Sequence, residues 1–240
     1  MRYIIIPTVI LILLLGVFPA FPSDTTDKET RDEVVGLFGT LLAPSIFTSA
    51  RSEQASILIH GRVLTEEGKV PDFDANPRDA IDEMNIYVSG RLSNLGLTLG
   101  FGEGSDFEFS QPIIVSVDYK AGLMKNDPTV DAALDIQYSM IVLPDEETID
   151  VSAMGFGVVS INGLLSANII PILEPYVGVT LNYVYLNSDA AGFIEAWKAV
   201  PKAGLKANLG MISIGSEVTF IANKHIESAW MWNLGASARF

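Results

Sequence analysis

The chain has 240 residues, a formal net charge of -14 and 49% hydrophobic residues, and its mean hydropathy is +0.34. No apolar run beyond the N-terminus reaches the roughly 18 residues that a spanning helix needs, which argues against a helical membrane protein. The acidic balance argues against a nucleic-acid partner, whose phosphates require clusters of Lys and Arg. The absence of cysteine excludes disulfides, thiolate nucleophiles and cysteine-ligated zinc.

Residues 1–22 predict a secretory signal peptide. Arg2 supplies the positive start, and the segment 4–18 is apolar although Pro7 interrupts it. The segment lacks a clean small-residue cleavage motif, so cleavage after Ala20 and cleavage after Ser23 both remain open. An uncleaved N-terminal anchor is the alternative.

Residues 23–54 predict a polar linker followed by a short amphipathic helix. Thr30 to Glu33 matches a helix capping box. Apolar residues then recur at helical spacing from Val34 to Leu42, before Pro44 ends the helix. This helix could plug a barrel, lie on a membrane surface, pack against the base of a barrel or be replaced by an extra strand.

From residue 56 onward, apolar and polar residues alternate with the period of two that sorts side chains onto the two faces of a β-strand. The runs 85–92 and 95–102 are joined at Ser93-Asn94, which is typical of a hairpin. In the second run Gly96, Thr98 and Gly100 share one face, which leaves space for something else on that side. The other predicted strands are 56–64, 112–123, 130–143, 148–160, 174–186, 202–209, 211–222 and 225–240.

The alternation is clearest in the last sixteen residues. One row is apolar and contains Trp230, Trp232 and the final Phe240, whereas the other contains Glu227, Asn233 and Arg239. This stretch resembles the closing strand of bacterial outer-membrane β-barrels, which typically ends in an aromatic residue. The resemblance covers about 55–240 and implies an all-β, antiparallel up-and-down transmembrane barrel. It also implies the lipid bilayer and the outer-membrane assembly machinery as partners.

Such barrels have even strand numbers, short periplasmic turns and longer outer loops. If the ambiguous segment 162–173 is a periplasmic connection, ten strands remain, with eight and twelve as alternatives. The outer loops are then 65–82, 103–111, 144–147, 187–201 and 223–224. The periplasmic turns are 93–94, 125–128, 162–173 and the neighbourhood of Gly210, and the N-terminal helix also falls on the periplasmic side.

The same alternation predicts two sets of side chains. The polar residues expected to line the lumen are His60, Arg62, Arg91, Asp118, Lys120, Asp135, Gln137, Asp150, Asn182, Lys202, Lys206, Glu217, Glu227 and Arg239. The residues expected to face lipid or to form an aromatic girdle are Val179, Leu181, Tyr183, Tyr185, Trp230, Trp232 and Phe240. A lining with both charge signs indicates either a lumen filled by its own ion pairs or a narrow polar path for a solute.

Two other features bear on chemistry. The loop 72–83 begins like a calcium-binding loop, but Pro77 stands where a glycine is needed for the sharp turn. His60 and His225 are the only histidines, and no motif of a serine hydrolase or zinc protease is present. We therefore expect no enzyme activity, no metal and no cofactor.

The sequence favours a monomeric outer-membrane barrel of a double-membrane bacterium, either structural or a narrow passive pore for small solutes. A secreted soluble β-barrel that binds an apolar ligand inside, as lipocalins do, is the alternative. An outer-membrane hydrolase is the second alternative. The first two hypotheses differ in whether the apolar side chains face outward or inward.

Overall fold

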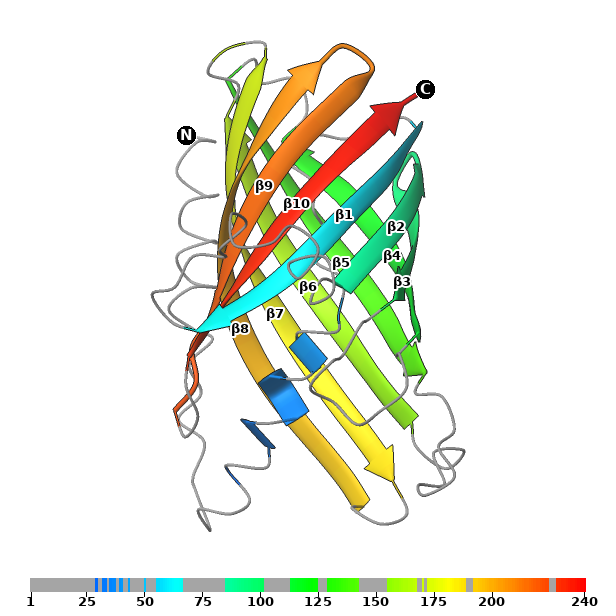
Figure 1. Ribbon diagram of the computed structural model, residues 1–240, viewed down its shortest axis with the longest axis vertical. Helices are drawn as coiled ribbons and strands as arrows, with labels where there is room; N and C mark the ends of the chain where they lie inside the picture. Colours follow the sequence, from blue (N-terminus) through cyan, green and yellow to red (C-terminus); the bar gives the residue numbers. More distant parts are fainter. Residues whose placement is uncertain are drawn as a thin grey trace, which may run out of the picture.

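The computed structural model describes residues 29, 32–33, 35–37, 39–40, 43, 50, 55–66, 85–101, 113–124, 129–142, 155–167, 170, 172–188, 192–224 and 228–240. Its strands are β1 (Ala55–Glu66), β2 (Asn85–Leu92), β3 (Leu95–Phe101), β4 (Ile113–Met124), β5 (Val130–Val142), β6 (Gly155–Ala167), β7 (Leu173–Ser188), β8 (Gly192–Leu209), β9 (Ile212–Ile221) and β10 (Ala229–Arg239). Each strand pairs with its sequence neighbours, and β1 pairs antiparallel with β10, which closes the barrel. The predicted ten-stranded antiparallel up-and-down barrel is confirmed (Figure 1).

The end of the barrel at which β10 finishes is called the C-terminal rim and lies at the top of Figure 1. The other end is called the opposite rim, and β7 and β8 extend far toward it. At the C-terminal rim the predicted tight turn at Ser93-Asn94 is confirmed, with Ser93 at a φ of 56°. The predicted turn near Gly210 is also present, and the φ of 76° at that residue suits glycine. Both hairpins therefore close with few residues at this rim.

The extents of two strands differ from the sequence prediction. The segment 162–167, expected in a connection, continues β6 and pairs with both β5 and β7. The segment 192–201, expected in an outer loop, is the first half of β8, and Pro201 pairs with Val179 within the sheet. Proline lacks the N–H that a central strand donates. The ladder between β8 and β9 begins at Lys202, so Pro201 pairs with β7 alone and stands at an edge position, where proline is tolerated.

The described part of the N-terminal segment lies inside the barrel. Helical residues between Glu29 and Thr40, followed by Ala43 and Ala50, contact inward-facing side chains of the wall; together these described residues of 29–50 are called the plug segment. Ala43 packs in one cluster with Tyr87 and Val184, whereas Ala50 packs with Ala133 and Leu164. In Figure 1 its helical pieces, in blue, lie against β7 and β8 in the lower half of the barrel. The segment therefore runs from near the opposite rim toward the C-terminal rim, where β1 begins.

This placement corrects the expectation that the helix lies at the periplasmic, C-terminal rim. The helix instead uses Glu29 and Glu33 to contact lysines of the opposite rim. Its position also fills space that would otherwise be an empty lumen. Among the described residues, no helix is both long enough and apolar enough to cross a membrane. The predicted signal peptide, 1–22, and the loops 67–84 and 102–112 lie outside the described residues.

Candidate functional site

Arg62, on β1, lies at the centre of the lumen and joins the wall to the plug segment. Its Nε donates to Oδ1 of Asn233 at 2.9 Å, and its Nη1 donates to the carbonyl oxygen of Ala43 at 2.7 Å. Its guanidinium also lies 5.0 Å from the ring centre of Tyr87, a cation–π distance. The ring of His60 stacks on the same tyrosine, with 4.8 Å between ring centres and 11° between ring planes. Arg62 therefore contacts side chains of two other strands, β2 and β10, and the plug segment.

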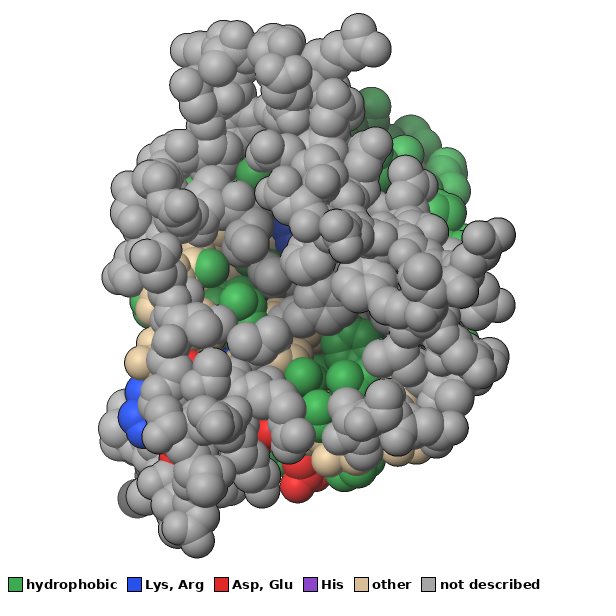
Figure 2. Space-filling view, turned by 60° about the horizontal axis from the view of Figure 1, so that its bottom comes forward, with side chains coloured by type: hydrophobic (Ala, Val, Ile, Leu, Met, Phe, Trp, Pro, Cys, Tyr) green, Lys and Arg blue, Asp and Glu red, His purple; other side chains and the backbone are tan. Residues whose placement is uncertain are grey.

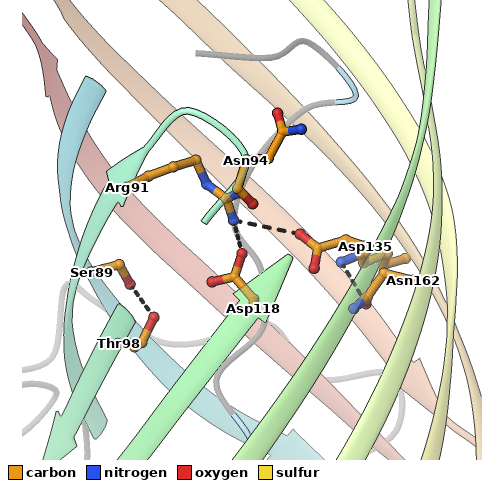
Figure 3. A network of polar contacts seen from close by, with 8 residues as sticks. Ser89, Arg91, Asn94, Thr98, Asp118, Asp135 and Asn162 are labelled. Atoms are coloured by element: carbon orange, nitrogen blue, oxygen red, sulfur yellow. Dashed lines mark hydrogen bonds and ion pairs between the residues drawn. The ribbon is translucent and has the colours of Figure 1, made fainter. Parts of the chain in front are cut away.

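A second group of charges lies between β2, β4 and β5. Figure 3 shows Arg91 directed toward two carboxylates, those of Asp118 and Asp135. Nη2 of Arg91 bonds to Oδ2 of Asp118 and lies 3.5 Å from Oδ2 of Asp135, and its Nη1 donates to the carbonyl oxygen of Asn94. Asp135 is fully buried. Burying a carboxylate without a cation costs several kcal/mol. Arg91 and the buried Lys120, which stands opposite Asp135 in the β4–β5 ladder, supply the cations near these acids.

The opposite wall carries a third group, on β7, β8, β9 and β10. Glu217 is its centre and contacts Lys202 Nζ at 3.7 Å. The Asn233 amide donates to Glu217 Oε1 at 3.1 Å, and the Tyr176 hydroxyl donates to Glu217 Oε2 at 3.1 Å. Because Asn233 also accepts from Arg62, this group is continuous with the centre of the lumen.

Near the C-terminal rim, Arg239 forms a cluster of hydrogen bonds with the β8–β9 hairpin. Its Nη2 donates to Asn208 Oδ1, to the carbonyl oxygen of Gly210 and to Ser213 Oγ, all at 3.1–3.2 Å. Asn208 in turn donates to Glu174 at 3.4 Å. The end of β10 is thereby joined to the β8–β9 hairpin by side chains as well as by backbone pairing.

At the opposite rim, the plug segment is held by ion pairs. Glu33 lies 3.7 Å from Lys198 Nζ and accepts from the backbone N–H of Lys224, and Glu29 lies 3.6 Å from Lys224 Nζ. Figure 2, which brings this end forward, shows acidic and basic side chains among the coloured atoms. Deeper in, the amide of Asn182 donates to Thr40 Oγ1 at 3.2 Å.

Gly39 allows the plug helix to approach the wall closely. A Cβ at this position would overlap Cγ1 of Val184. It would also lie 2.8 Å from Cγ2 and 3.1 Å from Cβ of the same side chain. A glycine inside a helix normally costs up to about 1 kcal/mol relative to alanine. Here the small residue is required by the packing against β7.

The space left by the glycines of β3 is taken by side chains from neighbouring strands. A Cβ at Gly100 would lie 2.6 Å from the Tyr87 ring, and a Cβ at Gly96 would overlap the Asp118 carboxylate. The sequence pattern indicated free space on this face. The structure shows that a buried tyrosine and a buried acid occupy it.

The outward face is apolar and, toward the opposite rim, aromatic. Tyr183 packs on Trp197 at 4.8 Å and lies 6.3 Å from Tyr185, whose hydroxyl is 2.9 Å from that of Tyr138. Trp230 packs on Phe220 at 5.1 Å. Leu181, Val179 and Trp232 lie half-buried between neighbouring side chains, and Phe240 is exposed at the C-terminal rim.

Most of the residues predicted to line the lumen are buried. These are His60, Arg62, Arg91, Asp118, Lys120, Asp135, Gln137, Asn182, Lys202, Lys206 and Glu217, and Arg239 is half-buried. Asp150, Glu227 and His225 lie outside the described residues. Sequence reasoning missed Tyr87, Glu174 and Tyr176, although each shares the inward parity of its strand. The two tyrosines were missed because tyrosine is also typical of an outward aromatic girdle, and Glu174 was missed because it stands at the first position of its predicted strand.

Among the described residues, this arrangement pairs charges and fills space. In the part of the chain that the structure describes, no three potential ligands among Asp, Glu and His cluster in a way that would hold a metal ion. The fold and its interior define a closed antiparallel β-barrel with a polar, plugged lumen and an apolar exterior.

Comparison with known proteins adds only distant likenesses. No protein-family model matches the chain, and no curated protein matches its sequence. The N-terminal β-barrel domain of OprF from Pseudomonas aeruginosa is 15% identical, with a TM-score of 0.36 over 79% of this chain and 100% of that one. The translocator domain of autotransporter NalP from Neisseria meningitidis is 10% identical, with a TM-score of 0.40 over 90% of this chain and 100% of that one. No function is inferred from likenesses at this level, and the fold is assigned from the strand pairing itself.

Proposed function

We propose that this protein is a non-catalytic outer-membrane β-barrel of a double-membrane bacterium, with a structural role and a lumen closed by its own N-terminal segment. The observation that carries the proposal is a distribution of side chains that is the reverse of the one in a soluble protein: the apolar side chains face outward, and the charged ones are buried. Its expected partner is the lipid bilayer.

The alternation on β5 illustrates why a bilayer suits this surface. Ile136 and Tyr138 are 48% and 46% exposed, whereas Gln137 between them is 1% exposed. The same pattern recurs on β3 and β9. Soluble proteins rarely expose contiguous apolar patches of more than a few hundred Å², whereas an outward apolar band flanked by aromatic residues is typical of membrane barrels. A soluble barrel that binds an apolar ligand inside would need the reverse orientation.

The filled lumen favours a structural role over an open pore. Arg62 and Asn182 bond to the plug segment at mid-height, and Glu33 pairs with Lys198 near the opposite rim. An open pore would require these contacts to break together. His60, stacked on Tyr87 inside the wall, has a packing role that supports the non-catalytic part of the proposal.

Two measurements test the proposal. Cell fractionation followed by detergent extraction is expected to recover the protein in the outer membrane; recovery in the soluble fraction would refute the membrane assignment. In planar bilayers the full chain is expected to show no sustained current. A stable open-channel conductance would instead favour the narrow passive pore.

A further inference from the structure

A small polar cavity lies between the plug segment and the barrel wall. Its volume is about 20 Å³, whereas one water needs about 10–15 Å³. Thr40 and Ala43 of the plug segment line one side, and the wall contributes Arg62, Lys202 and Thr219 among others. The space suits one water or one monatomic ion and is too small for a sulfate, a phosphate or an organic solute.

Three buried polar atoms of lining residues have no hydrogen-bond partner within the protein. They are Nδ2 of Asn162, Oγ1 of Thr219 and Oε1 of Gln137, and the three residues are at most 3% exposed. A buried polar group without a partner costs about 1–3 kcal/mol. Their convergence on one cavity therefore indicates a bound species that satisfies them.

The chemistry of the lining favours an anion. Arg62 and Lys202 are basic, Asn162 and Thr219 offer donors, and none of the described lining residues is acidic. The carbonyl oxygen of the Asn162 side chain already accepts from Thr180 and lies 3.5 Å from Lys202 Nζ. The amide N–H groups of Asn162 are therefore the part of this side chain that can donate to a bound species. Rotating the Gln137 amide by 180° exchanges its acceptor for a donor without changing its shape.

We propose that the cavity binds one halide ion, chloride being the abundant one in nature, between the plug segment and the barrel wall. The ion would contact Arg62 and Lys202 together with the Asn162 and Thr219 donors. Because Arg62 also bonds to Ala43 of the plug segment, binding at this cavity would stabilise the plugged form. This inference depends on the plugged lumen and not on the membrane assignment.

Thermal unfolding of the purified full chain in detergent tests the proposal. Ionic strength would be held constant while sodium gluconate is replaced by sodium chloride, sodium bromide or sodium sulfate. Sulfate raises unfolding midpoints without binding a site, because it is excluded from protein surfaces. Halide binding is therefore measured as a midpoint that increases with the logarithm of chloride or bromide concentration. A midpoint that does not increase with halide concentration would overturn the proposal and leave the cavity to water.

A pair of matched variants locates the effect. Thr219→Val removes a donor that lines the cavity, whereas Thr98→Val removes a buried hydroxyl that bonds to Ser89 on another wall. We expect the first to lose most of the halide dependence and the second to keep it; an unchanged halide dependence in Thr219→Val would overturn the assignment. If Thr219→Val does not fold, bromide-soaked crystals of the wild type decide. An anomalous peak in the cavity supports the site, and density without an anomalous signal identifies a water.

Discussion

Arg62 on β1 donates a hydrogen bond of 2.7 Å to the carbonyl oxygen of Ala43, so the first strand of the barrel holds the segment that precedes it in the chain. The two residues are 19 positions apart, and β1 begins between them, at Ala55. This contact joins the plug segment to the wall at the level where Asn233, Tyr87 and His60 also meet.

Replacing Arg62 by methionine is expected to loosen the plug segment. The variant loses charged hydrogen bonds to Ala43 and Asn233, each worth about 1.5–3 kcal/mol, while the methionine keeps much of the side-chain volume. We expect a lower free energy of unfolding and brief current openings in planar bilayers. Arg239→Met at the C-terminal rim is the control and should stay silent. Equal behaviour of the two variants would mean that Arg62 does not retain the plug segment.

Adding a methyl group at Gly39 is expected to push the plug helix off β7. The new Cβ would overlap the Val184 side chain, and such overpacking typically costs about 1–3 kcal/mol. Gly163→Ala is the control, because a Cβ there meets nothing within 4 Å. Unfolding in denaturant measures both variants. A second change, Val184→Ala, should relieve part of the cost in the Gly39→Ala background, and strict additivity would contradict the contact.

The ion pair between Arg91 and Asp118 is expected to be strongly coupled. Asp118→Leu alone removes one partner of a buried pair, which typically costs about 3–5 kcal/mol because the other charge stays buried. The double variant Arg91→Met with Asp118→Leu should cost less than the sum of the single changes, by about 0.5–3 kcal/mol. Unfolding free energies of the four proteins form the cycle. Ser116→Ala, on the same strand and bonded to Ser139, is the control for loss of an uncharged polar contact.

An arginine on the outward face is expected to lower the free energy of unfolding by an amount that depends on its depth in the bilayer. Leu181 lies midway along β7 and pairs with Ile161 and Ala199, whereas Leu209 ends β8 at the C-terminal rim. We expect about 2–4 kcal/mol for Leu181→Arg and about 0–1 kcal/mol for Leu209→Arg in lipid vesicles, as at a bilayer midplane and interface. Equal costs at both positions would argue against a membrane around this surface.

The sequence by itself determined the fold class and the side that residues of the predicted strands face. Period-two alternation is a local property, because successive side chains of any strand point to opposite faces. Asn182 and Leu181 could therefore be assigned to opposite faces before any pairing was known, and in the structure Asn182 is buried while Leu181 is half-buried on the other side. The hairpin at Ser93-Asn94 was equally local.

Only the tertiary structure decided where strands end and which inward side chains meet. Segments 162–167 and 192–201 are strands because long neighbours pair with them, although Pro201 and the adjacent Leu164 and Leu165 weaken their local signal. Parity places Arg62 in the lumen, but it does not say that Arg62 binds Ala43 or that Glu33 of the plug segment binds Lys198. Those contacts depend on the curvature of the closed barrel and on the path of the plug segment, which residues far apart in the chain create together.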